Sequence, residues 1–109
     1  MNLHYTLPDR EQELLAGPLH GQKLRYCVPY DLDKEGNLCG DGWIAVTGER
    51  LYILKDGAIA DSIDLAAADA ILCVPQIDSG LLLVKQGEKE RLLCRFTMRH
   101  MVRCSYVAR

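Results

Sequence analysis

The chain has 109 residues, of which 49% are hydrophobic and 26% charged, and this length and composition are those of one globular domain with one core. No apolar run approaches the roughly 20 residues that cross a bilayer, and no basic start followed by an apolar block indicates a signal peptide. The net charge of −2 disfavours nucleic acid and an anionic membrane surface as partners, because both require a basic field. The five cysteines include no CxxC pair, which argues against a disulfide framework or a zinc ribbon and favours a reducing compartment.

Residues 1–21 predict an N-terminal arm with one short helix. The segment LHYTL, residues 3–7, has the pattern of a possible short strand. Pro8 can open a helical turn that acidic residues fill, and Gly17-Pro18 is expected to stop it.

A strand is predicted next, at residues 22–30. Leu24, Tyr26 and Val28 alternate with polar or small neighbours, which is the period of a strand with one buried face. Pro29 cannot donate a backbone hydrogen bond, so we expect the strand to end there, at a sheet edge.

The polar, glycine-rich stretch Asp31 to Gly42 is interpreted as the loop of a hairpin. Asp31, Asp33 and Glu35 mimic the opening of an EF-hand loop, in which oxygen ligands alternate before a glycine. The ninth and twelfth positions are Cys39 and Gly42 instead of a ligand and a bidentate Glu, and the flanks are strands. A solvated hairpin loop is therefore favoured, and weak calcium binding by the three acidic residues is left open.

The best-defined element is a hairpin over residues 43–54, WIAVTGERLYIL. Gly48-Glu49 fits a two-residue type II′ turn with glycine at the position of positive φ. Counting outward from that turn places Ile44, Val46, Leu51 and Ile53 on one apolar face, which is predicted to be the core face. The other face is apolar at the end away from the turn, and the C-terminal segment is expected to cover it.

Asp56-Gly57 makes the following turn, and it allows two registers. A two-residue turn is one; the other, which we prefer, is a type I turn with Gly57 as a G1 bulge, because it places Ile59 opposite Ile53 and Ile63 on the same core face. The chain then passes a short connection at residues 66–68 and three further strands, interrupted by Pro75 and by turns at residues 78–80 and 86–89.

Residues 97–109 predict an amphipathic helix with Thr97 as N-cap and an apolar stripe at helical spacing, made of Met98, Met101, Val102, Ser105 and Ala108 or Arg109. The stretch lacks a C-cap glycine or a following proline, so we expect this domain to be part of a longer polypeptide.

Nothing in the sequence combines a nucleophile with a base, or histidines with metal-ligand spacing. Cys73 and Cys94 are predicted to be small core residues rather than reactive thiols. Residues of this chain are therefore assigned no catalytic, cofactor or metal role.

The order of seven strand candidates followed by one amphipathic helix predicts a mainly β fold of the pleckstrin-homology-like (PH-like) kind, with residues 22–109 as the domain and its strands at about 22–96. Such folds have two roughly orthogonal antiparallel sheets in a partly open barrel, and a C-terminal helix covers one end. In phosphoinositide-binding members a basic loop holds the phosphates, whereas the matching loop here carries Asp31, Asp33, Glu35 and Asp41, so phosphoinositide binding is not expected.

The stretches DLDKEGNLCGDGWIAVTGERLYILKDG and CRFTMRHMVRCSYVAR resemble the N-terminal cytosolic domain of certain Firmicute-type bacterial ABC exporters. The resemblance covers residues 26–109. It implies a non-catalytic regulatory or interaction domain at the cytoplasmic face of the cell membrane, whose partner is the rest of its own transporter chain or a partner half-transporter. ATP binding and the membrane helices would lie outside these residues, which contain no Walker A motif. The alternatives are a free-standing protein- or peptide-binding module and, last, a small enzyme.

Overall fold

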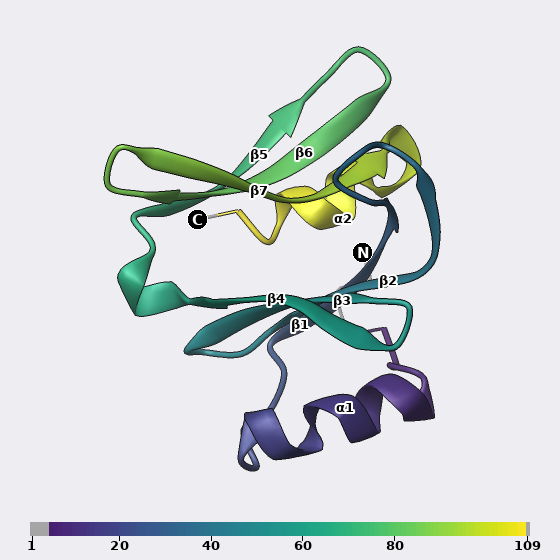
Figure 1. Cartoon of the computed structure of the whole chain (residues 1–109), viewed down its shortest axis with the longest axis vertical. Helices are drawn as coiled ribbons and strands as arrows, with labels where there is room; N and C mark the ends of the chain where they lie inside the picture. Colours follow the sequence, from purple (N-terminus) through teal and green to yellow (C-terminus); the bar gives the residue numbers. More distant parts are fainter. Residues whose placement is uncertain (1–4, 109) are drawn as a thin grey trace.

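The computed structural model describes residues 5–108 and shows a mainly β chain of seven strands with short helices (Figure 1). The elements in order are α1 (Asp9–Leu19), β1 (Tyr26–Leu32), β2 (Leu38–Val46), β3 (Arg50–Lys55), β4 (Ala58–Asp64), the 3-10 turn η1 (Leu65–Ala67), β5 (Ala70–Pro75), β6 (Ser79–Gln86), β7 (Lys89–Thr97), the 3-10 turn η2 (Met98–His100) and α2 (Met101–Ser105). No helix within residues 5–108 is long and apolar enough to span a membrane.

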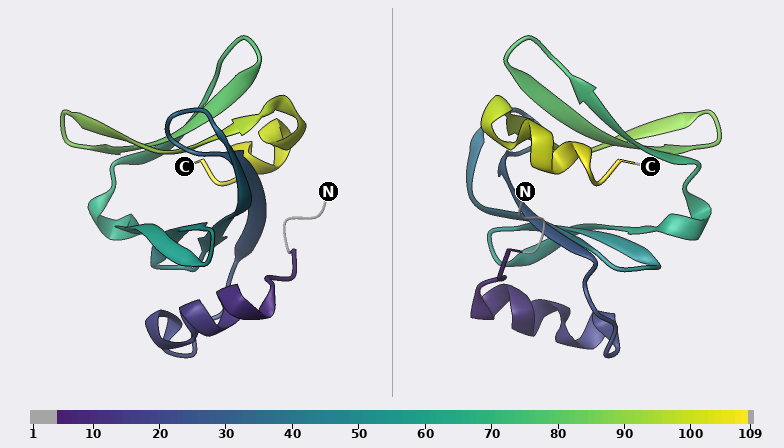
Figure 2. Two further views of the ribbon diagram at one scale, coloured as in Figure 1. Left: turned by 45° about the vertical axis from the view of Figure 1, so that its right-hand side comes forward. Right: turned by 180° about the vertical axis from the view of Figure 1, so that it is seen from behind.

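The strands form one antiparallel sheet in the order β4-β3-β2-β1-β7-β6-β5. Strands β1 to β4 form one meander and β5 to β7 a second, and the two are joined by the single pair Leu32↔Arg95. Because β4 and β5 are the two ends of the order, the sheet does not close into a barrel. The two meanders lie as separate layers with α2 between them, while α1 lies beyond the first layer (Figures 1 and 2). The mainly β, seven-stranded prediction is confirmed.

The register of the central hairpin is confirmed: Ile44 faces Ile53 and Val46 faces Leu51. These four residues are buried in the main core together with residues of β6, β7 and α2. The predicted turn type is wrong, because Gly48 is not at positive φ. Thr47 closes the turn instead: its Oγ1 accepts hydrogen bonds from Glu49 N at 3.1 Å and Arg50 N at 2.9 Å.

The second face of this hairpin is covered by α1, not by the C-terminal segment as expected. Ala45, Tyr52 and Leu54 are buried in a second core cluster with Leu7 and Leu15. The C-terminal segment packs into the main core instead, through Cys104 and Val107. Both α1 and the C-terminal segment are amphipathic and could cover an apolar face of a sheet. The spacing of their apolar residues does not indicate which of them covers which face. Of the predicted strand at residues 3–7, only 5–7 are described, and they are not a strand.

Both ends of the predicted 31–42 loop belong to strands. The true loop is short because the Asp33 side chain and Gly36, at φ 86°, close it. The glycine at position 42 has a packing role: a Cβ there would lie 2.7 Å from the Tyr30 carbonyl oxygen and 2.8 Å from its ring.

Pro29 lies inside β1, so the prediction that it ends the strand is wrong. It pairs with Trp43 of β2 on one side, and β7 meets β1 only later, at Leu32. The missing N–H is tolerated because this part of β1 is locally an edge. The Cys104 sulfur of α2 approaches the Pro29 carbonyl oxygen at 3.9 Å. Helix α1 likewise continues two residues past Gly17, through Pro18.

The preferred register of the β3–β4 turn is also wrong. Asp56 and Gly57 both have positive φ, 49° and 81°, as a two-residue type I′ turn requires, and Ile59 pairs with Leu54. The register shifts further along, between Ile53 and Leu54, where Ala60 is the extra residue. The two-residue turn places Ile59 beside Leu54 against the second cluster, and the bulge then brings Ile63 opposite Leu51, in the main core as predicted.

The C-terminal helix is shorter than predicted, and its buried side is rotated. After β7 the chain makes the 3-10 turn η2, and α2 covers only residues 101–105. Thr97 makes no side-chain cap, so its predicted N-cap role is wrong. The buried residues are His100, Cys104 and Val107, whereas Met98 is 49% and Val102 56% exposed. The tighter 3-10 turn changes the phase of the stripe.

Candidate functional site

The three acidic residues that mimic a calcium loop do not converge. Asp31 lies in β1 and uses both carboxylate oxygens on Thr97, accepting from its N at 2.8 Å and from its Oγ1 at 2.5 Å. Asp33 accepts at Oδ1 from the backbone N of Glu35 and of Asn37, at 3.0 and 2.9 Å. Within residues 5–108, the side chains include no group of three His, Cys, Asp or Glu residues that could hold a metal ion.

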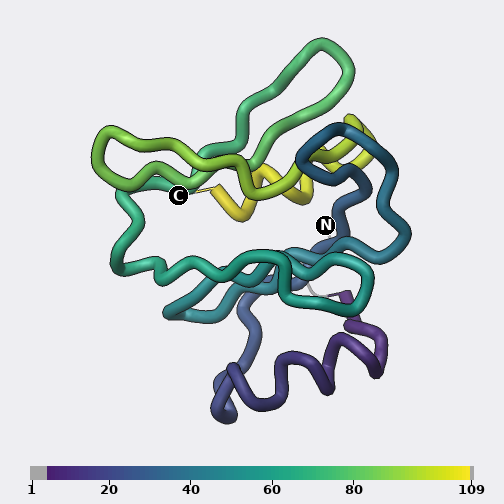
Figure 3. The backbone as a smooth tube through the Cα atoms, viewed as in Figure 1, coloured from purple at the N-terminus to yellow at the C-terminus, as the bar shows by residue number. Residues whose placement is uncertain are grey.

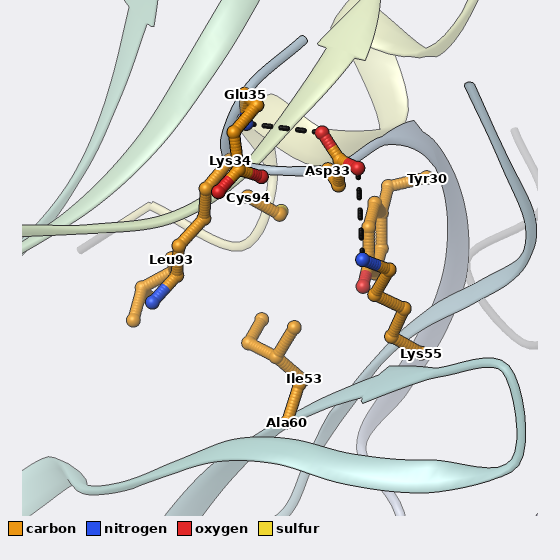
Figure 4. Close-up of a pocket in the computed structure, with 9 residues that line it drawn as sticks. All are labelled: Tyr30, Asp33, Lys34, Glu35, Ile53, Lys55, Ala60, Leu93 and Cys94. Atoms are coloured by element: carbon orange, nitrogen blue, oxygen red, sulfur yellow. Dashed lines mark hydrogen bonds and ion pairs between the residues drawn. The ribbon is translucent and has the colours of Figure 1, made fainter. Parts of the chain in front are cut away.

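A cavity of about 190 Å³ lies between the two meanders on their open side (Figure 4). Its apolar walls are Ile53 of β3, Ala60 of β4 and Leu93 and Cys94 of β7. Three of the polar residues, Asp33, Lys34 and Glu35, lie in the β1–β2 loop, whose path beside the end of β7 is visible in Figure 3. The other two are Tyr30 of β1 and Lys55 at the end of β3.

Two β-bulges shape this cavity. Ala60 is the extra residue in β4, and Leu93 is the extra residue in β7, where the register shifts between Leu82 and Leu83. Both line the cavity. Close by, Arg91 Nη1 donates to both Asp61 carboxylate oxygens at 2.8 Å and so links β7 to β4 across the open side of the sheet. Bulges turn a side chain away from its regular direction, and here they turn two toward one space.

The charged groups around the cavity differ in their partners. Lys55 Nζ lies 3.6 Å from Asp33 Oδ2. The backbone hydrogen bond from Asn37 is the main cause of a lowered Asp33 pKa, and the hydrogen bond from Glu35 and the Lys55 charge act in the same direction. By contrast, Lys34 and Glu35 are exposed to solvent, and their charged groups have no hydrogen bond or ion pair with other described residues. Figure 4 shows both side chains at the edge of the cavity.

The phenol and the thiol that line the cavity are both in their protonated, unreactive forms. The Tyr30 hydroxyl donates to the Leu54 carbonyl oxygen at 2.9 Å, and burial raises the pKa of that phenol. Burial also raises the pKa of the Cys94 thiol well above its ordinary value, which keeps it protonated. Neither the Tyr30 phenol nor the Cys94 thiol is therefore activated for nucleophilic or acid–base chemistry.

A second feature is the outer side of the β5–β7 meander. Ile71, Leu82 and Val84 point into the core, and the alternating residues point the other way. Cross-strand pairs Leu72↔Leu83, Val74↔Leu81 and Leu83↔Leu92 put aliphatic side chains together there. We call this surface the outer apolar face; its residues, all only half-buried, are Leu72, Val74, Leu81, Leu83 and Leu92. No helix of the described chain lies over it (Figures 1 and 2).

His100 joins η2 to β1. It is 8% exposed, its Nε2 lies 3.7 Å from Asp31 Oδ2, and its Nδ1 is buried with no hydrogen-bond partner in the described chain. Burial lowers the pKa of His100; Asp31 opposes that shift, while Arg99 and Arg103 add to it. The histidine is therefore held neutral at neutral pH.

Sequence reasoning found none of the cavity residues as a group. Lys34 and Lys55 look like ordinary surface lysines in the sequence. The two bulges that bring the walls together cannot be recognised from the alternation of apolar and polar residues along a strand. The only available signal was the acidic loop, whose first aspartates have structural partners instead. No family model, curated protein or solved structure matches the chain.

Proposed function

We propose that this chain is a non-catalytic interaction domain of the PH-like class in an ABC exporter, and that it docks through the outer apolar face. That face is the observation that carries the proposal. The resemblance of residues 26–109 to the N-terminal domains of such exporters supports the transporter context. In this context the domain lies at the cytoplasmic face of the membrane, and ATP is bound by another part of the transporter.

The first meander indicates what kind of partner covers such a face. Its own second face, made of residues such as Ala45, Tyr52 and Leu54, is covered by the amphipathic helix α1 through Leu15. The outer apolar face presents the same kind of side chains on paired strands, and it has no such helix. An amphipathic helix of the transporter chain, or of a partner half-transporter, is the occupant that fits.

The outer apolar face would be one part of a larger interface. Fully burying a leucine or valine side chain stabilises by about 1.5–3 kcal/mol relative to full exposure. The five aliphatic side chains are already largely buried, so a partner that covers them gains at most roughly 1 kcal/mol from each, before the cost of association is subtracted. Single exposed apolar residues are common on protein surfaces, whereas a contiguous set is typical of an interaction site.

The experiment is site-specific photo-crosslinking in the cells that produce the protein. A photoreactive phenylalanine analogue at Leu83 is expected to crosslink to a helical segment of an ABC transporter, identified by mass spectrometry. The variant Leu83→Asp should remove the crosslink from a second reporter position at Leu72 without lowering the melting temperature by more than a few degrees, because Leu83 is only half-buried.

The matched control is Leu38→Asp, since Leu38 is 81% exposed and lies outside the outer apolar face. Its crosslinking should equal that of the unaltered protein. A crosslink to a protein without membrane helices or a Walker A motif would favour the free-standing binding module instead. If the photoreactive residue gives no crosslink at Leu83 or at Leu72, docking through this face is wrong.

A further inference from the structure

We propose that residues 5–19 form a displaceable cap, and that the face of the first meander beneath them is a binding site for an amphipathic helix whose buried positions are all aliphatic. We call these residues the N-terminal cap. The face that they cover, which we call the capped face, is made of Trp43, Ala45, Tyr52, Leu54 and Ile59. The proposal is carried by a buried carboxylate in the cap. It does not depend on docking through the outer apolar face, which belongs to the other meander.

The capped face has the chemistry of a helix-binding surface. Ala45, Tyr52 and Leu54 lie on the paired strands β2 and β3 and are buried. Helix α1 is seated on them as a separate outer layer (Figures 1 and 2). Among residues 5–108, the cluster that they form with the cap shares no residue with the main core between the meanders. Removal of the cap therefore does not require the main core to open.

The cap matches that face poorly at one position. Its buried residues are Leu7, Glu11 and Leu15, four positions apart, so a carboxylate lies where an amphipathic helix has an apolar side chain. Glu11 is only 1% exposed, and its Oε1 accepts from Arg10 Nη2 at 3.1 Å. Its Oε2 is buried and has no hydrogen-bond partner in the described chain. A buried polar atom without a partner destabilises the contact that buries it.

The polar contacts between the cap and the first meander do not compensate for this mismatch. Arg10 Nη2 lies 2.9 Å from Asp41 Oδ2, but both side chains are more than half exposed, and exposed ion pairs contribute little to stability. The Tyr52 hydroxyl donates to the Pro18 carbonyl oxygen at 3.4 Å, which is a long hydrogen bond. Isolated helices as short as α1, with its 11 residues, are marginal in water. The cap is therefore held mainly by its two buried leucines.

The connection after α1 allows the cap to move away. His20 and Gly21 both have positive φ, 49° and 81°, and residues 20–23 are exposed. The connection is tied to the sheet at Arg25, whose N donates to the Val46 carbonyl oxygen at 2.6 Å. A cap that leaves the face stays attached through these residues, so it competes with any other helix as an intramolecular ligand. A helix with an aliphatic side chain in place of Glu11 keeps the leucine contacts and lacks the unpartnered oxygen, which is why it is the occupant that fits.

The first test is amide hydrogen exchange of the whole chain. The amides of residues 13–19 should exchange at least about a hundredfold faster than those of Ile44 and Ile53, because release of the cap leaves the sheet folded. Glu11→Leu should slow exchange in α1 about tenfold or more, since it removes the unpartnered oxygen. The matched control is Glu13→Leu, the same change at an exposed position of α1, which should alter the exchange little. The proposal is overturned if α1 exchanges at the rate of the sheet, or if Glu11→Leu does not slow it.

Binding is tested with a dye-labelled synthetic peptide of residues 5–22 that carries Glu11→Leu, followed by fluorescence anisotropy. A peptide with the unaltered sequence should bind at least about tenfold more weakly, because it brings the same carboxylate to the capped face. In the protein, Leu15→Asp should open the cap and raise the affinity for the peptide about tenfold or more, whereas Glu11→Leu should lower it. The matched control is Ala16→Asp, at an exposed position of α1, which should leave the affinity unchanged.

Each remaining outcome of the binding experiment contradicts the proposal. If the Leu15→Asp protein keeps its protected sheet amides and still does not bind the peptide, the capped face is not a helix-binding site. If the unaltered, Leu15→Asp and Glu11→Leu proteins bind the peptide equally, the peptide binds elsewhere. If Leu15→Asp unfolds the sheet, the cap is an integral part of the fold and is not displaceable.

Discussion

The same substitution, glycine to alanine, is expected to destabilise the fold at Gly80 and to have little effect at Gly17. Gly80 is buried in β6 opposite Phe96, and a Cβ there would lie 2.3 Å from Phe96 Cε2 and 3.0 Å from Met101 Sδ. Ordinary carbon contacts are about 3.5–4.0 Å, so the ring or the strand must move by roughly 1 Å. Because Phe96 is 0% exposed and packed on all sides, Gly80→Ala should cost about 1–3 kcal/mol of unfolding free energy.

At Gly17 the added methyl group meets nothing within 4 Å apart from its chain neighbours, and the residue lies within α1 without a positive φ. Alanine gains about 0.5–1 kcal/mol of helix propensity over glycine, but Pro18 follows and disfavours a helical backbone for a preceding residue that carries a Cβ. Gly17→Ala should therefore change the stability little. In thermal unfolding, each kcal/mol corresponds to roughly 4–8 °C for a domain of about this size.

The cause at Gly80 is tested by a double-mutant cycle with Phe96→Leu. If the clash with the ring is responsible, the double variant loses less stability than the sum of the two single variants. A Gly80→Ala protein that melts at the same temperature as the unaltered one would refute the packing argument. So would strict additivity in the cycle.

Three further predictions follow from individual contacts. Thr47→Ala should destabilise by about 1–3 kcal/mol in chemical denaturation, because the backbone N–H groups of Glu49 and Arg50 lose their buried acceptor, whereas Thr47→Ser should retain most of the stability. The lowered pKa of His100 means that the folded state binds fewer protons than the unfolded state, in which the pKa is near 6.5; this contribution is therefore fully present above pH 6.5 and is lost as the pH falls through the folded pKa. His100→Gln should flatten that part of a stability-against-pH curve, and an unchanged curve would contradict the assignment. Burial raises the pKa of Cys27 to about 12, so in the native protein at pH 8 Cys27 should react with iodoacetamide many times more slowly than in the unfolded chain, as peptide mass spectrometry after timed quenching would show.

The parts of the fold that were predictable are those set by local pairing. In the central hairpin the two-residue loop fixes which residues face each other, and a period of two then assigns every side chain to a face. Ile44 opposite Ile53 follows without any knowledge of distant contacts. The buried position of Ile63 was predicted from a turn register that is wrong, and it is correct only because the bulge at Ala60 returns Ile63 to the core face.

The predictions that were wrong have a different cause. They concern features that are determined by contacts with segments far away in the chain. Pro29 is tolerated inside β1 because β7 joins that strand only at Leu32. The stripe of the C-terminal helix shifted to His100 because a 3-10 turn precedes it and Asp31 of β1 lies beside it. Likewise α1 covers the second face of the central hairpin, where the C-terminal segment was expected. The candidate cavity belongs to this class entirely, since its walls come from β3, β4 and β7.

The bulge at Leu93 has a consequence for the proposed docking. It interrupts the alternation of β7, so that Leu92 belongs to the outer apolar face while Leu93 and Cys94 both point into the core. A partner on the outer apolar face would thus contact Leu92, whereas the next two residues of the strand stay within the core. Leu92→Asp should therefore weaken the Leu83 crosslink in a folded protein, whereas Leu93→Asp should unfold the domain, because it buries an unpaired charge. Equal melting temperatures for the two variants would contradict this division of the strand.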